Sequence, residues 1–171
     1  MTRRIVTFII AATLSMSSFA KPIGEYFKAI PASICPFADK AVISEETVDY
    51  LSASVTSVSD IQMRFLTNSE GAKVICLVKT FKAPEAESEV TTYDLDWNEI
   101  ETHKFCLEDI SSEASAASKY FEPLLISATL HSASEEITLK VTPVDLSDEE
   151  KESIKDIKLQ TTLKWNGKTF K

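Results

Sequence analysis

Glycine and histidine are scarce in this sequence, and the scarcity of glycine excludes a class of active site. The 171 residues include three glycines and two histidines. Phosphate-binding loops and the nucleophile elbows of serine hydrolases need closely spaced glycines, because the backbone must approach a ligand or turn sharply there. Gly24, Gly71 and Gly167 lie far apart in the chain. Glycine-rich nucleotide sites and G-x-S-x-G hydrolases are therefore excluded.

The two histidines limit nucleophilic catalysis in a similar way. A serine, cysteine or threonine nucleophile needs an adjacent base, and His103 and His131 are the available imidazoles. A small hydrolase remains as the enzyme alternative, either metal-assisted or with His103 beside the thiolate of Cys76 or Cys106. The simpler interpretation is a packed thiol and an exposed imidazole. We assign no catalytic residue and no cofactor from the sequence.

Long hydrophobic runs are absent apart from one near the start. Arg3 and Arg4 precede the apolar run 5–14, and Ser18 and Ala20 place small residues where a leader is cleaved. No stretch reaches the length that a membrane span needs. We therefore expect a cleavable signal peptide at 1–20, a single domain at 21–171 without a transmembrane anchor, and export to the periplasm or the medium.

Arginine is nearly absent once the leader is set aside. The formal net charge is −8 for the whole chain, and it becomes −10 after residues 1–20 leave with two arginines and no acid. Arg64 is then the one arginine that remains. Binding to a phosphate backbone relies on clustered lysine and arginine, so nucleic acid and anionic membranes are not expected partners.

Cysteine is present in an odd number. Three cysteines, Cys35, Cys76 and Cys106, cannot all pair within one molecule, although an exported protein permits disulfides. Cys76 lies in an apolar run, where cysteine usually acts as a small hydrophobic side chain. We expect no disulfide, and the pair to examine first is Cys76 with Cys106.

What the sequence does contain is a series of short β-type patterns. Apolar and polar residues alternate in several runs. Residues 74–78 are apolar throughout, as expected of a strand covered on both faces or lying centrally in the sheet. The expected strands are 58–67, 74–78, 93–97, 103–110, 124–131, 135–142 and 159–165. Helical spacing or capping patterns predict helices at 23–30, 44–51, 113–121 and 147–157. Short connections favour an α+β fold with one antiparallel sheet of about six or seven strands, and short helices covering one face.

Two groups of polar residues resemble metal sites, and neither meets the requirements. Zinc needs three or four ligands, and the segment with Glu99, Glu101, His103, Cys106, Glu108 and Asp109 offers one histidine and one cysteine. Asp94, Asp96 and Asn98 resemble the start of a calcium loop, but its required glycine and glutamate are replaced by Glu99 and Phe105. We assign no metal ligand.

Aromatic residues offer another possible binding surface. Trp97 and Trp165 each end an alternating run, and tryptophan is common at interfaces. Each has the inward phase of its strand, so burial is the favoured interpretation. In the β-rich stretch 72–100, the acidic connection Pro84–Glu89 is the part we expect to be free for contact.

Four segments together resemble a known family. The segments are Tyr26–Ser33, Ile75–Thr80, Tyr93–Trp97 and Thr162–Phe170. In this order they resemble an uncharacterised exported Bacteroidales family, domain of unknown function 3256. The resemblance implies a secreted or periplasmic protein and supplies no catalytic residue.

The functional expectation follows mostly from the absence of a coherent active-site pattern in the sequence. We expect a non-enzymatic recognition module for an envelope protein, peptide or glycan. The alternatives are the hydrolase above and a structural or assembly factor of the cell surface, which would carry a contiguous exposed apolar patch. The sequence leaves the oligomeric state open.

Overall fold

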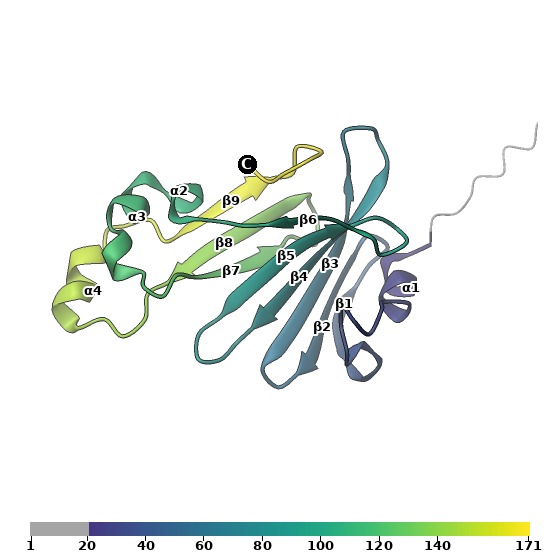
Figure 1. Ribbon diagram of the computed structural model, residues 1–171, viewed down its shortest axis with the longest axis horizontal. Helices are drawn as coiled ribbons and strands as arrows, with labels where there is room; N and C mark the ends of the chain where they lie inside the picture. The colour runs from purple at the N-terminus through teal and green to yellow at the C-terminus, as the bar shows by residue number, and fades with distance from the viewer. Residues whose placement is uncertain (1–20) are drawn as a thin grey trace, which may run out of the picture.

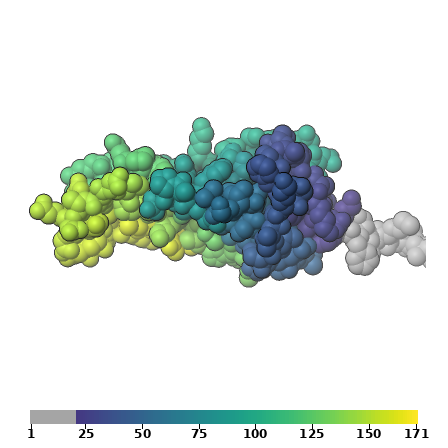
Figure 2. All heavy atoms as spheres, turned by 90° about the horizontal axis from the view of Figure 1, so that it is seen from below, coloured from purple at the N-terminus to yellow at the C-terminus, as the bar shows by residue number. Residues whose placement is uncertain are grey.

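The computed structural model describes residues 21–171, so the expected leader at 1–20 lies outside the described residues. The molecule is elongated, with the N-terminal half at one end of the long axis and the C-terminal helices at the other (Figures 1 and 2). No helix within residues 21–171 has the length and apolar character needed to span a membrane.

A six-stranded antiparallel sheet forms the larger part of the fold. Its strands follow the order of the chain, β1-β2-β3-β4-β5-β6, so each pairs with the next through a short turn or loop. This sheet confirms the expected α+β class. The strands are β1 (Val42–Glu46), β2 (Tyr50–Thr56), β3 (Ser59–Thr67), β4 (Lys73–Phe81), β5 (Glu87–Tyr93) and β6 (Glu99–His103).

A second, three-stranded sheet contains the C-terminal strands in the order β7-β8-β9. Our expectation placed all strands in one sheet, and the difference arises because the helical segment after β6 carries the chain away from the first sheet (Figure 1). The strands are β7 (Leu125–Leu130), β8 (Glu136–Thr142) and β9 (Gln160–Lys164). The helices are α1 (Ile23–Lys28), η1 (Ala38–Lys40), α2 (Leu107–Ile110), α3 (Ser112–Ala116), η2 (Ser118–Tyr120) and α4 (Asp148–Ile154).

Both faces of the six-stranded sheet are covered, which explains the continuous apolar run in β4. Ile75 and Leu77 belong to the N-terminal core, where α1 and the following segment pack on one face. Cys76 and Val78 belong to the inter-sheet core, where the three-stranded sheet packs on the opposite face. Successive strand residues point to opposite faces, so an apolar residue is needed at every position. The expectation of a strand covered on both sides is confirmed.

The expected helix at 44–51 is wrong. Residues 42–46 form β1, a turn follows, and β2 begins at Tyr50. The Thr47 hydroxyl accepts hydrogen bonds from the amides of Asp49 and Tyr50 in this turn. Glutamates after a serine resemble a helix start, but pairing of β2 with β3 along the whole strand outweighs that weak local preference.

The region from 87 to 110 also differs from expectation. The acidic connection is partly strand, because β5 starts at Glu87 and ends at Tyr93, where we had placed the beginning of a strand. Residues 94–98 form a turn, and Trp97 has a φ of 65°. The expected strand at 103–110 is wrong: β6 ends at His103, and 107–110 is the helix α2.

Side chains of the larger sheet form hydrogen bonds with backbone amides at the free edge of β7. The amide of Ala128 donates to Ser88 Oγ at 2.9 Å, and the amide of Leu130 donates to Gln62 Oε1 at 2.9 Å. Because an unpaired buried amide is costly, these two bonds fix where the small sheet sits on the large one. Polar residues that alternate in β3 therefore face the inter-sheet layer rather than open solvent.

Candidate functional site

The most distinctive surface feature is an apolar groove at one end of the six-stranded sheet. It has a volume of about 440 Å³ and is bounded by the segment before η1 on one side and the ends of β2, β3 and β4 on the other. These segments lie on the side of the molecule that faces the reader in Figure 2. Its apolar lining residues are Ile34, Cys35, Pro36, Phe37, Val55, Val58, Ile61 and Phe81.

Three large side chains of this groove are half-exposed. Phe37 and Val58 retain 50% of their accessible surface, and Phe81 retains 53%. Each comes from a different segment: Phe37 from the turn before η1, Val58 from the β2–β3 turn and Phe81 from the last position of β4. Single exposed apolar residues are common, whereas several that line one groove indicate a contact surface.

The groove opens beside the connection that we had singled out for contact. The connection Pro84–Glu89 begins three residues after Phe81, and Glu87 is the cross-strand partner of Phe81. The groove itself was not predicted, because Phe37, Val58 and Phe81 are far apart in sequence. The one available signal was the position of Phe81 and Val58 at strand ends, where solvent exposure is common.

His103 lies inside the protein rather than on its surface. The residue is 8% exposed, and its ring makes edge-on contacts with Trp165 and Phe170, at centroid distances of 5.8 and 5.7 Å. Nε2 lies 3.3 Å from Thr92 Oγ1. Burial lowers the pKa of His103, and the Glu101 carboxylate opposes that effect in part. The expectation of an exposed imidazole is wrong for His103, which packs as a neutral core residue.

We predict that His103 makes stability depend on pH. Below its ordinary pKa of 6.5 the unfolded chain takes up a proton that the folded chain resists, so stability falls as the pH drops through this range. Urea midpoints at pH 7.5 and 5.5 should therefore differ more for the wild type than for His103→Gln. Equal differences in both proteins would contradict the prediction.

The residues of the zinc-like segment do not converge. Glu99 accepts a hydrogen bond from Thr102 and Glu108 accepts one from Ser115, while His103 points into the core. Asp109 accepts a hydrogen bond at 2.8 Å from the amide of Cys106, which caps α2. Across the described part of the chain, no group of three or more His, Cys, Asp or Glu side chains is arranged to hold a metal ion.

The calcium-like residues form a closed turn. One Asp94 oxygen accepts from the amides of Asp96 and Asn98, and the other accepts from the Asn98 side chain at 2.8 Å. The Asn98 side-chain hydrogen bond is the main cause of a lowered pKa for Asp94. The carboxylate is thus committed to shaping the β5–β6 connection, and Trp97 packs edge-on against Tyr93.

The three thiols are free and chemically quiet. Cys35 and Cys76 are buried, and burial raises the pKa of each thiol. Cys106 is exposed, but the Glu108 and Asp109 carboxylates and slight burial raise the pKa of its thiol as well. A reactive cysteine needs the opposite shift, toward the thiolate. The chemistry proposed for a cysteine hydrolase therefore has no support at these positions.

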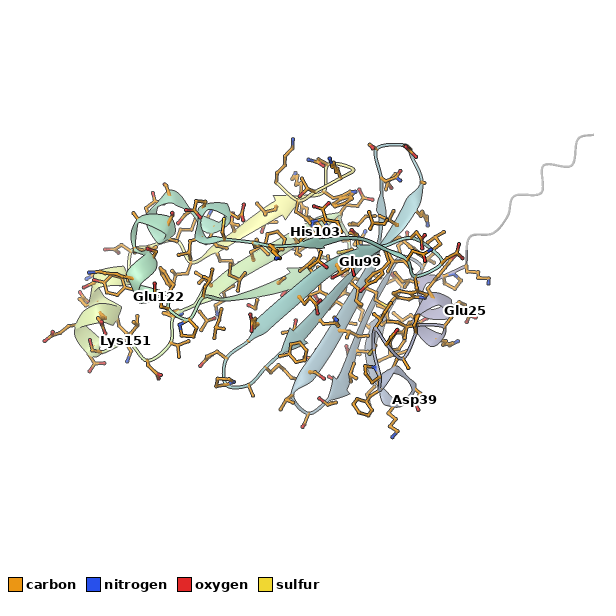
Figure 3. The ribbon with its side chains drawn as sticks, in the orientation of Figure 1. Glu25, Asp39, Glu99, His103, Glu122 and Lys151 are labelled. Atoms are coloured by element: carbon orange, nitrogen blue, oxygen red, sulfur yellow. The ribbon has the colours of Figure 1, made fainter. Side chains whose placement is uncertain are left out.

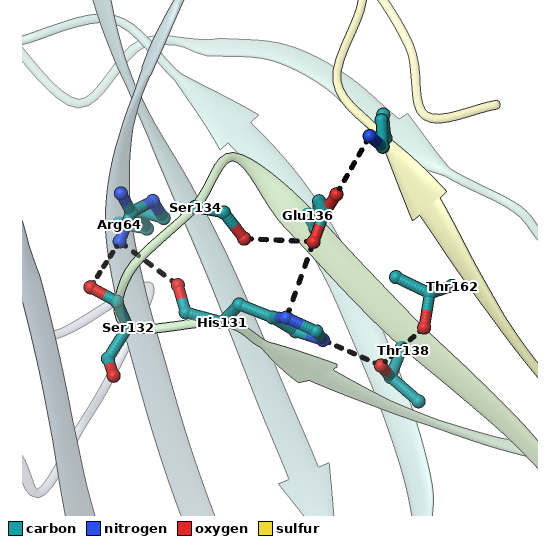
Figure 4. Close-up of polar contacts among 8 residues, drawn as sticks. Arg64, His131, Ser132, Ser134, Glu136, Thr138 and Thr162 are labelled. Carbon is teal, nitrogen blue, oxygen red and sulfur yellow. Dashed lines mark hydrogen bonds and ion pairs between the residues drawn. The ribbon is translucent and has the colours of Figure 1, made fainter.

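His131 belongs to a polar network on the small sheet. Its Nε2 lies 2.7 Å from Thr138 Oγ1, and its Nδ1 lies 3.6 Å from Glu136 (Figure 4). Glu136 also receives a hydrogen bond from Ser134, which is the main cause of its lowered pKa, and it pairs with Lys164. The Thr138 hydroxyl is in turn hydrogen-bonded to the Thr162 hydroxyl. The network links β7, β8 and β9 across the sheet and brings together one carboxylate, not two, so it serves as a cross-strand connection.

Trp165 is half-buried, as its strand phase predicts. Its indole N–H donates to the Thr67 carbonyl at 2.7 Å, and its ring packs against Phe170. His103 and Glu99 mark the course of β6 beside this cluster in Figure 3. These contacts are those of a packing residue that connects the end of β9 to β3.

Residues 34–170 match the profile of a family described as "Protein of unknown function (DUF3256)". The chain belongs to the DUF3256 family. This confirms the resemblance seen in the four sequence segments. None of the curated proteins matches this DUF3256 chain.

A solved structure shares the fold of the DUF3256 chain. It is described as a domain of an uncharacterized protein from Porphyromonas gingivalis W83, with a TM-score of 0.71 and 19% sequence identity. The match covers 89% of this chain and 98% of that chain. At this identity the similarity shows a common fold, and the function must be inferred from the surface of the molecule.

Proposed function

We propose that this DUF3256 protein is an exported recognition module that binds a segment of another envelope polypeptide. The observation that supports this function is the apolar groove with Phe37, Val58 and Phe81 at its edges. Half-exposed aromatic side chains around a groove provide anchor contacts of the kind that dominate protein–protein interfaces. The leader-like residues 1–20 support export to the periplasm or the medium.

The nature of the groove favours a polypeptide over a glycan. Sugars need convergent hydrogen-bonding groups beside an aromatic face, whereas the lining here is mostly apolar and Lys79 is held by an ion pair with Glu89 at 2.7 Å. The groove is also partly open to solvent, unlike the enclosed pocket in which a small apolar ligand is carried. An apolar side chain of a partner would be buried in it with its backbone still accessible.

The proposal is tested by exchanging groove residues for serine. Phe81→Ser and Phe37→Ser should each reduce recovery of the partner at least tenfold when the tagged protein is pulled down from native envelope and identified by mass spectrometry. Truncating a large anchor residue at an interface typically weakens the binding free energy by more than 2 kcal/mol. Because both side chains are half-exposed, folding should change little.

Val42→Ser and Val48→Ser are the matched controls. Both valines are exposed and lie outside the groove, so they test whether any loss of surface apolarity has the same effect. A partner that is recovered equally with the groove variants and the controls would overturn the proposal, as would a partner released by glycan-degrading treatment. Thermal unfolding of each variant verifies that the fold is intact.

A further inference from the structure

The strand register places carboxylates on the same face as the groove. Phe81 pairs with Glu87, and Lys79 pairs with Glu89, in the β4–β5 ladder. Residues directly opposite each other in an antiparallel pair point to the same face, so Glu87 and Glu89 project beside the groove. Glu85 follows Phe81 closely in the exposed β4–β5 loop, and Asp39 lies in η1 at the other side (Figure 3).

One of the two lysines on the groove face is paired with a carboxylate, and the other keeps its charge. Lys79 pairs with Glu89 at 2.7 Å. Lys82 pairs with Asp60 at 2.9 Å, but on the opposite face of the sheet. Lys40 lies over the ring of Phe37, 5.9 Å from its centroid. On the groove face, Lys40 and Lys79 therefore stand against four carboxylates, namely Asp39, Glu85, Glu87 and Glu89. Within residues 21–171, Glu85 and Glu87 have no cationic partner among the ion pairs that form.

We infer that the groove selects a cationic segment: one large apolar side chain flanked by lysine or arginine. This inference rests on the proposed function and specifies the chemistry of the partner. The apolar side chain enters between Phe37, Val58 and Phe81, and the flanking cations lie against Glu85 and Glu87. Charges at the rim of an interface act mainly on selection and on the association rate, so the apolar contact supplies affinity and the carboxylates supply specificity.

Synthetic peptides separate the two contributions. The protein, purified after export, is titrated with four capped nine-residue peptides that have a central Phe or Ser and two Lys or two Glu on each side. Binding is followed by fluorescence anisotropy at 50 and 500 mM salt. The peptide with Phe and Lys should bind about tenfold more tightly than the peptide with Phe and Glu at low salt, and the difference should shrink at high salt.

Variants then assign the effect to the named residues. The double variant Glu85→Gln with Glu87→Gln should reduce the preference for Lys flanks at least threefold, while Phe81→Ser should abolish binding of both Phe peptides. Glu149→Gln, on the remote helix α4, is the charge control. Because these carboxylates are exposed, their replacement should leave unfolding unchanged.

The outcomes distinguish this inference from the proposed function. Equal binding of both Phe peptides, lost in Phe81→Ser, overturns the cationic preference and leaves the groove as a recognition site. If the Lys peptides bind whether the central residue is Phe or Ser, and Phe81→Ser does not weaken this binding, both the cationic preference and the proposed groove function are overturned. Absence of binding by all four peptides at millimolar concentration overturns the inference, and the pull-down then decides on the groove.

Discussion

Replacing Leu77 with alanine should lower the free energy of unfolding by about 2 to 5 kcal/mol. Leu77 lies in the middle of β4 with no exposed surface, and its side chain packs in the N-terminal core. Strand β4 is paired with β3 and β5 along almost its whole length, so the backbone cannot easily collapse into the cavity left behind. The lost contacts and the residual cavity both contribute to the cost.

Leu95→Ala is the control for Leu77→Ala because it removes the same atoms. Leu95 lies in the β5–β6 turn and is 38% exposed, so its replacement should cost about 0.5 kcal/mol or less. Urea unfolding followed by far-UV circular dichroism gives both values. Similar costs for the two variants would show that β4 does not lie at the centre of two cores.

Replacing Arg64 with alanine should cost about 2 to 4 kcal/mol. Arg64 is 9% exposed, and one terminal guanidinium nitrogen donates to the carbonyl oxygens of His131 and Ser132 at 3.0 and 2.8 Å (Figure 4). These bonds join β3 to the turn after β7. Truncation removes two charge-assisted hydrogen bonds and leaves a gap at the junction of the two sheets.

The setting of Arg64 also suggests an informative second replacement. Its Nε is buried without a hydrogen-bond partner, and its partners are neutral carbonyls rather than carboxylates, so part of its desolvation cost is uncompensated. Arg64→Met keeps most of the packing and removes the charge, and it should be less destabilising than Arg64→Ala. An Arg64→Met protein more stable than the wild type would show that the buried charge costs more than its hydrogen bonds contribute.

Lys73→Ala is the control for Arg64. Lys73 also carries a positive charge on the larger sheet, but its ion pair with Asp49 is exposed, so its loss should cost about 1 kcal/mol or less. Hydrogen exchange locates the effect: Arg64→Ala should increase exchange in the β7–β8 turn first. Uniform loss of protection, or none, would contradict a local connection between the sheets.

The candidate site could be anticipated only in part. The exposed connection Pro84–Glu89 was expected to be free for contact, and its neighbour Phe81 lines the groove. Phe37 and Val58 were not anticipated, because they meet Phe81 only when the chain before η1 folds back over the sheet. The alternation in 58–67 also gave no sign that Gln62 and Arg64 bind the small sheet.

Periodicity and turn chemistry by themselves determined the elements whose signals are local. They predicted the strand at β3, the doubly covered β4, the strands β7, β8 and β9, and the Ser147 capping box of α4, which the structure shows with Ser147 and Glu150 bonding each other. The segments 44–51 and 103–110 were predicted wrongly, because strand pairing and helix packing with distant residues outweigh weak local preferences. The division into two sheets, the burial of Arg64 and His103, and the groove were decided by tertiary structure alone. Each of these features depends on which other part of the chain covers a given face of a strand. Alternation along a strand shows that it has two different faces, but it does not show what packs on either face.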